Sequence, residues 1–121
     1  MAIVQVAATI AASAAVSSAI EANGRRVVGI IGPTAWTAAD YSFEVYDSVN
    51  AAWRKLVDAA GALVKITGAA TATSEVMLTP EIADRLTFNR FRVASTNTAS
   101  EADINQDAAR TIYVLLEAAT R

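Results

Sequence analysis

Residues that commonly carry enzyme chemistry are scarce in this chain of 121 residues. It contains no histidine and no cysteine, which excludes imidazole bases, thiol chemistry, disulfides and zinc fingers. The remaining acid–base candidates are 12 scattered aspartates and glutamates. Two close pairs stand out, Asp40 with Glu44 and Asp103 with Asp107. Solvated acids at turns and strand starts are their simplest interpretation, so we expect neither enzyme activity nor a cofactor.

One loop has the spacing of a calcium site. Asp103, Asn105 and Asp107 present oxygen atoms at alternate positions, but an EF-hand would next need a glycine and later a glutamate. Ala108 and Val114 occupy those two positions. We therefore predict a polar turn here and no metal site.

Arg90 and Arg92 form a small positive spot, because residues two apart share one face of a strand. Phe91 between them points to the other face, so the spot lacks the interleaved aromatic rings of a nucleic-acid groove. The formal net charge of -2 agrees with the absence of a nucleic-acid partner. Solvent or a protein partner is the expected neighbour of Arg90 and Arg92.

Aromatic side chains offer two interpretations. Trp36 and Trp53 could form part of a sugar-binding platform, together with Tyr41, Phe43 and Tyr113. The alternative is that most of them are anchors of the core or of an interface.

The composition indicates the elements that must position these residues. Val and Ile number 21 against 6 Leu, and Thr adds 12. Branching at Cβ suits a pleated sheet and restricts rotamers in a helix, so the chain is predicted to be all-β. The number of alanines, 28, is unusually high for such a domain.

The first 20 residues carry no charged side chain. They are rich in Ala, Ser and Thr and lack a basic start, so neither a signal peptide nor a membrane span is expected. Apolar residues on even positions favour two strands, about residues 3–10 and 14–22, whereas the alanines leave a helix as the alternative. Asn23-Gly24 then forms either a hairpin turn or a helix C-cap.

Alternation and turn residues predict further short strands along the rest of the chain. Tyr41–Val45 is expected to have one solvated face, and Asp47–Asn50 to form a turn. Thr111–Glu117 is expected to be buried on both faces, by the domain or by a neighbour. The predicted strands are Arg26–Ile31, Tyr41–Val45, Ala51–Val57, Leu63–Thr67, Glu75–Leu78, Phe88–Ser95 and Thr111–Glu117.

Short strands with frequent turns predict one all-β domain over residues 1–121, a single β-sandwich of jelly-roll-like type with short antiparallel strands. A loop of small residues, 68–74, and a turn over 79–84 separate the later strands. An extended arm over residues 1–12 is an alternative for the beginning of the chain.

Three segments resemble one group of proteins. They are GRRVVGIIGPTAWTAADYSFEV (residues 24–45), FRVAS (91–95) and NQDAARTIYVLL (105–116), in this order. Together they resemble small structural proteins of tailed bacteriophages and prophages, including capsid decoration (cement) proteins. The segment 51–83 departs most from that pattern.

The resemblance implies a virion component on the outer surface of the head, assembled in the host cytoplasm, with the major capsid protein as its partner. Shell symmetry suggests a homo-oligomer, taken as a trimer. The uncharged N-terminal stretch could add to a neighbour's sheet edge, so the expected contacts are Val4, Val6 and Ile10, with Arg90 and Arg92. The alternative is a module of a tail or fibre that binds host glycans through Trp36 or Trp53.

Overall fold

Nine strands and no helix are found in the residues that the structure describes. The structure is a computed structural model that describes residues 3–66, 76–78, 89–97 and 99–118. Within those ranges no helix is long and apolar enough to cross a membrane. In chain order the strands are β1 (Ile3–Ile10), β2 (Ile20–Glu21), β3 (Arg25–Ile31), β4 (Asp40–Asp47), β5 (Ala52–Lys55), β6 (Lys65–Ile66), β7 (Val76–Leu78), β8 (Arg90–Thr96) and β9 (Arg110–Ala118).

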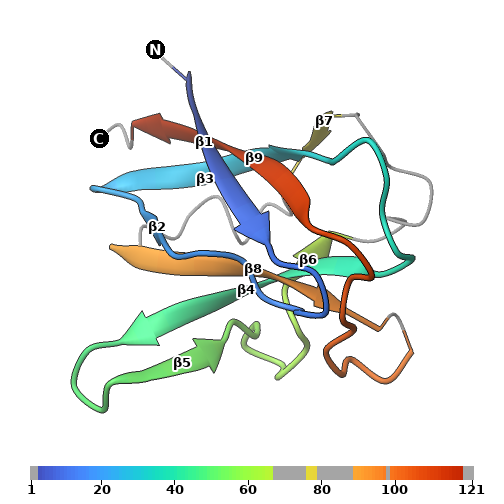
Figure 1. Cartoon of the computed structure of the whole chain (residues 1–121). Coiled ribbons are helices and arrows are strands. Elements are labelled where there is room, and N and C mark those ends of the chain that lie inside the picture. The colour runs from blue at the N-terminus through green and yellow to red at the C-terminus, as the bar shows by residue number, and fades with distance from the viewer. Residues whose placement is uncertain (1–2, 67–75, 79–88, 98, 119–121) are drawn as a thin grey trace.

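The strands form two antiparallel sheets packed against each other, which confirms the predicted all-β sandwich (Figure 1). Sheet A has the strand order β1-β9-β3-β7. Sheet B has the order β2-β8-β4-β5, and β6 pairs with the beginning of β4. The jelly-roll type stays a prediction.

The core lies between the two sheets and is built from the inward residues of the alternating strands. Its largest fully buried side chains include aliphatic residues from both sheets and Tyr41, whose burial raises the pKa of its hydroxyl. Trp36 packs against this core and stacks on Tyr41, with ring centroids 4.4 Å apart. The buried core residues are Ala8, Ile10, Ile20, Ala22, Ile30, Tyr41, Phe43, Val64, Ile66, Phe91, Val93, Ile112, Val114 and Leu116.

The N-terminal segment is a strand of sheet A and not an extended arm. Its whole length pairs with β9, from Ile3 opposite Glu117 to Ile10 opposite Arg110. The even positions, which alternation places on one face, point inward, and Ile10 is fully buried.

The second predicted strand, 14–22, is shorter than expected. Continuous pairing with β8 is limited to Ile20–Glu21, and an isolated bridge joins Val16 to Ala94. The ladder is interrupted because the hydroxyl of Ser17 accepts the hydrogen bond of the Val93 amide (3.0 Å) in place of a backbone carbonyl.

The expectation of a solvated face on β4 was wrong. Ser42 and Glu44, on the polar face, are both buried. Their polar atoms are satisfied there, since Ser42 Oγ lies 2.5 Å from Thr96 Oγ1 and Arg92 donates to Glu44. Local alternation could not reveal these partners, because they lie on another strand.

The domain itself covers one of the two faces of the strand over 111–117, so burial of the other face by a neighbour stays a prediction. Ile112, Val114 and Leu116 are fully buried, but Thr111 and Tyr113 on the other face are exposed. Within the domain, β9 therefore has one buried face.

Two predicted turns are present. Asp47 accepts hydrogen bonds from the side chain of Asn50 and from the amides of Asn50 and Val49, which lowers its pKa. Asn23 and Gly24 have φ angles of 53° and 77°, which is typical of the turn that an Asn-Gly pair favours. This turn links β2 in sheet B to β3 in sheet A, so it is not a hairpin within one sheet.

The remaining strands agree in place and differ in length. The strand predicted over 51–57 is limited to β5, whereas within the described residues of 63–67 and 75–78 the strands are β6 and β7. The predicted loop 68–74 and turn 79–84 lie outside the described residues.

Candidate interaction surface

The two arginines predicted to face a partner lie on the outer face of sheet B, and each is already paired. Arg90 Nε lies 2.7 Å from a carboxylate oxygen of Glu21, and Arg92 lies 2.6 Å from Glu44. Arg92 is also half-buried. Because an acid on a neighbouring strand neutralises each guanidinium, the two residues do not form a free positive spot.

Aromatic rings pack beneath these guanidinium groups. The guanidinium carbon of Arg92 lies 4.3 Å from the ring centre of Trp53, and that of Arg90 lies 5.2 Å from the ring centre of Tyr46. The rings of Tyr46 and Trp53 meet edge to face, 5.2 Å apart. Cation–π contacts of this kind hold the side chains in place across three strands. The face of Trp53 is therefore occupied by Arg92, which speaks against a sugar platform there.

Trp36 is no better placed for a sugar. Its ring stacks on Tyr41, and its Nε1 donates to the carbonyl oxygen of Ala39 (3.1 Å). Tyr41 and Phe43 are buried in the core. Of the five aromatic candidates, Tyr113 is the one that exposes a large part of its side chain.

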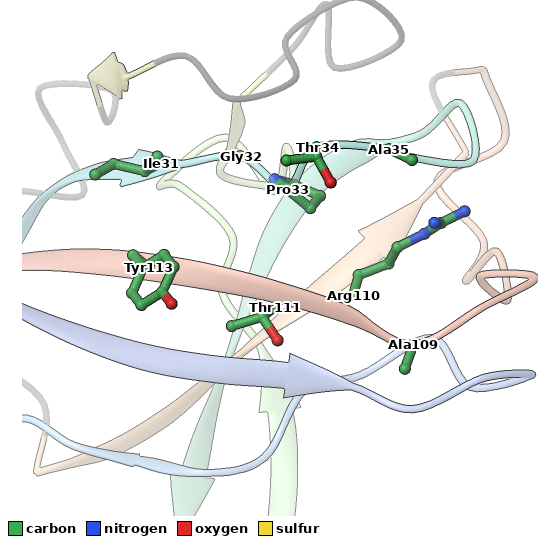
Figure 2. Close-up of a pocket in the computed structure, with 9 residues that line it drawn as sticks. All are labelled: Ile31, Gly32, Pro33, Thr34, Ala35, Ala109, Arg110, Thr111 and Tyr113. Carbon is green, nitrogen blue, oxygen red and sulfur yellow. The ribbon is translucent and has the colours of Figure 1, made fainter.

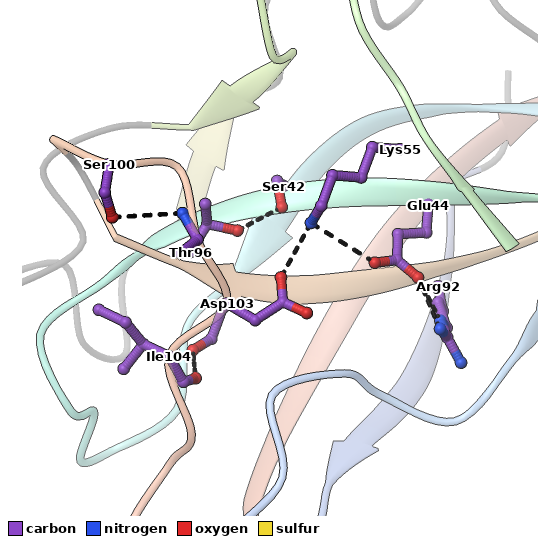
Figure 3. Close-up of polar contacts among 10 residues, drawn as sticks. Ser42, Glu44, Lys55, Arg92, Thr96, Ser100, Asp103 and Ile104 are labelled. Carbon is purple, nitrogen blue, oxygen red and sulfur yellow. Dashed lines mark hydrogen bonds and ion pairs between the residues drawn. The ribbon is translucent and has the colours of Figure 1, made fainter.

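Acids that could have formed a catalytic or calcium site are distributed among basic partners. Figure 3 shows Lys55 between Asp103 and Glu44, at 2.9 and 3.7 Å. Asp107 is held by Arg110 (2.5 Å). Within the described ranges, no group of three or more potential ligands could hold a metal ion.

Asp40, the remaining member of the two acid pairs noted in the sequence, lies in the buried part of β4. Its carboxylate is 1% exposed and lies 3.4 Å from the ammonium group of Lys65. Asp40 and Glu44 thus have separate cationic partners, Lys65 for the first and Arg92 and Lys55 for the second.

The outer face of sheet A is different in character, because its central part carries no charge. We call it the neutral face. Among its residues, Ile3 and Tyr113 are large hydrophobic side chains that remain 55% and 43% exposed. The neutral face comprises Ile3, Gln5, Ala7, Thr9, Ile31, Thr111, Tyr113 and Leu115.

Ion pairs mark the two ends of the neutral face. At one end Arg26 lies 2.7 Å from Glu117, and at the other Arg110 lies 2.5 Å from Asp107. Both pairs join neighbouring segments of this domain, so neither leaves an uncompensated charge at the border of the face.

An open groove of about 460 Å³ runs beside Tyr113, between the end of β3 and the start of β9 (Figure 2). The buried Gln106 joins the segment that follows β3 to the segment that precedes β9. Its side-chain amide accepts from Thr37 N (2.8 Å) and donates to Thr37 O (3.1 Å). The lining residues are Ile31, Gly32, Pro33, Thr34, Ala35, Ala109, Arg110, Thr111 and Tyr113.

The three N-terminal residues predicted to contact a partner point the other way. Val4 and Val6 are half-buried on the inner side of β1, and Ile10 is fully buried, so Ile10 is a core residue and not a contact. The exposed residues of the same strand are the odd ones, beginning with Ile3. Sequence alternation identified the two faces of β1 but not which of them is covered by the second sheet.

Comparisons with known proteins do not extend these findings. The chain matches no protein-family model, and neither a curated protein nor a solved structure matches it significantly.

Proposed function

We propose that this chain is a structural, non-enzymatic β-sandwich module that binds another protein through the neutral face. The single observation that carries the proposal is the uncharged face of sheet A, on which Ile3 and Tyr113 remain 55% and 43% exposed. Binding to such a surface requires no desolvation of charge, and burial of apolar area supplies the driving force.

The partner class follows from the resemblance of the sequence to virion proteins of tailed phages. We propose a capsid decoration protein that sits on the outer surface of the head, with the major capsid protein beneath it. A rigid sandwich with one uncharged face suits this role, because a ligand that binds the assembled shell stabilises it by mass action.

A direct test uses heads purified without this chain, to which the protein is added before cryo-EM. Wild-type protein is expected to give density repeated over the shell. Tyr113→Lys places a charge within the contact and is expected to lower occupancy by about tenfold or more. Val49→Lys is the matched control, since Val49 is 90% exposed in the turn between β4 and β5, away from sheet A.

The results separate the alternatives. Density confined to the tail, or equal binding by both variants, would contradict the proposed role of the neutral face. Absence of binding to the heads would remove the decoration role altogether.

Glycan binding by a tail or fibre module is the second candidate, and we propose the groove beside Tyr113 as its site. The groove beside Tyr113 combines an exposed aromatic ring with the hydroxyls of Thr34 and Thr111, which suits a sugar better than the covered rings of Trp36 and Trp53. A glycan array probed with the wild-type protein and with Tyr113→Ala distinguishes this function, which requires hits that the variant loses.

A further inference from the structure

The outer edge of β1 has backbone groups that no strand among the described residues pairs with. β1 is the end strand of sheet A, with β9 on one side. On the other side, the segment that follows β1 covers the edge at Thr9. There Ser18 N donates to Thr9 O (3.0 Å), and Thr9 N donates to Ser18 Oγ (3.3 Å). Between Ile3 and Ala7, no described residue pairs with this edge.

The direction of the Thr9 groups shows which residues present their backbone at the edge. In an antiparallel ladder, the N–H and C=O of one residue point to the same side, and successive residues alternate. Since both groups of Thr9 point away from β9, those of Ile3, Gln5 and Ala7 do so as well. Each presents one donor and one acceptor to an incoming strand.

β1 also lacks the features that normally protect an edge. Natural edges are shortened, bulged, or carry Lys or Pro. Over its 8 residues β1 has no charge and no proline, and its register with β9 is unbroken. By comparison, the edge strands β2 and β7 have 2 and 3 residues, and β5 carries Arg54 and Lys55.

We infer that β1 pairs antiparallel with β1 of a second copy of this chain across a twofold axis. The register that uses all the free edge groups places Gln5 opposite Gln5 of the partner and Ile3 opposite the partner's Ala7. No charge meets a like charge in this arrangement, because β1 is uncharged.

Side chains on the neutral face fit the same register. Ala7 pairs with Tyr113 on β9, so the partner's Ile3 would come next to the small Ala7 and near the Tyr113 ring. The two large hydrophobic side chains left exposed on this face would then cover each other. A charged peptide would gain backbone hydrogen bonds but no charge pairing from this edge, whereas an identical strand also supplies an apolar residue opposite each apolar one exposed.

The inference goes beyond the proposed function and does not depend on it. Edge pairing would extend the neutral face into one surface shared by two copies and leave that face open to a third protein. Twofold pairing of identical edges closes at two copies, which differs from the trimer expected from shell symmetry.

Sedimentation equilibrium over micromolar to millimolar concentrations tests the pairing, since a strand edge alone is a small interface that gives weak association. A reversible monomer–dimer equilibrium is expected. Gln5→Lys places two ammonium groups opposite each other and is expected to weaken dimerisation by about tenfold. The matched control is Thr111→Lys, which adds the same charge on the same face one strand away from the edge.

Cross-linking reports the register, and the native chain contains no cysteine to interfere. Opposed residues in a hydrogen-bonded antiparallel pair have Cα atoms about 5.5 Å apart, within the range of a disulfide. Gln5→Cys is therefore expected to form a disulfide-linked dimer on mild oxidation. Thr9→Cys is expected to stay monomeric, because Ser18 covers that part of the edge.

Each outcome of these experiments supports or overturns the inferred pairing of β1. A dimer that Gln5→Lys weakens and Gln5→Cys traps, with circular dichroism showing both variants folded, supports the inference. A monomer at every concentration or a trimer overturns it. Equal sensitivity to Gln5→Lys and Thr111→Lys also overturns it, since the contact would then lie on the face and not at the edge.

Discussion

Buried polar side chains of sheet B depend on partners from neighbouring strands. The hydroxyls of Ser42 and Thr96 are both fully buried and lie 2.5 Å apart. Thr96→Val leaves the Ser42 hydroxyl without that partner, and we expect it to lower the free energy of unfolding by about 1–3 kcal/mol. Urea denaturation measures the loss.

The double variant Ser42→Ala/Thr96→Val serves as the control, since it removes both polar groups together. It is expected to be more stable than Thr96→Val alone, because neither position then leaves a buried hydroxyl that has lost its partner. Additive losses from the two substitutions would show that the hydrogen bond does not couple the two residues.

At the scale of the elements, β1 illustrates how one strand serves both core and surface. Ile10 is fully buried, whereas Ile3 is 55% exposed. We expect Ile10→Ala to lower the free energy of unfolding by about 2–5 kcal/mol. Ile3→Ala should change it by no more than about 0.5 kcal/mol. Thermal or urea unfolding of the two variants checks this, and equal small effects would indicate that residues 3–10 form a detachable arm.

Strands were predictable where the local pattern of apolar residues is strong. The segments that became β1 and β4 were located from alternation, and those that became β3 and β9 from nearly continuous apolar runs. The environment of these strands could not be predicted in this way, because it depends on pairings, such as Ile3 with Glu117, between residues that are distant in sequence. For the same reason the sequence suggested Ile10 as a contact, and alternation alone could not identify Ile3 or Tyr113 as the exposed pair on one face.

For the whole molecule, the shared core predicts that the two sheets unfold together. Trp36 packs on the core, whereas Trp53 lies on the outer face of sheet B under Arg92. Fluorescence of Trp36 in Trp53→Phe, and of Trp53 in Trp36→Phe, is expected to change at the same urea concentration as the circular dichroism of each variant. Different midpoints for the fluorescence and the circular dichroism within one variant would mean that the surroundings of that tryptophan lose structure separately from the rest of the sandwich.

The sandwich could be predicted from composition and turn spacing, but the contrast between its two outer faces could not. Sheet B gathers ion pairs such as Arg92 with Glu44, whereas the central part of the outer face of sheet A is uncharged. The acids and bases involved are dispersed along the chain, and the pairing of strands brings them to one side.

The position of β9 has a consequence for the order in which the protein forms during synthesis. β9 lies between β1 and β3, so sheet A has no inner strand until residues 110–118 have left the ribosome. Until then β1 has no partner strand within sheet A, and β3 can pair only with β7. Such long-range closure is slow, and it leaves an uncharged strand exposed to other nascent chains. The yield of native protein should therefore depend on how rapidly translation passes the last strand of the sheet, and on the chaperones that hold β1 until it does.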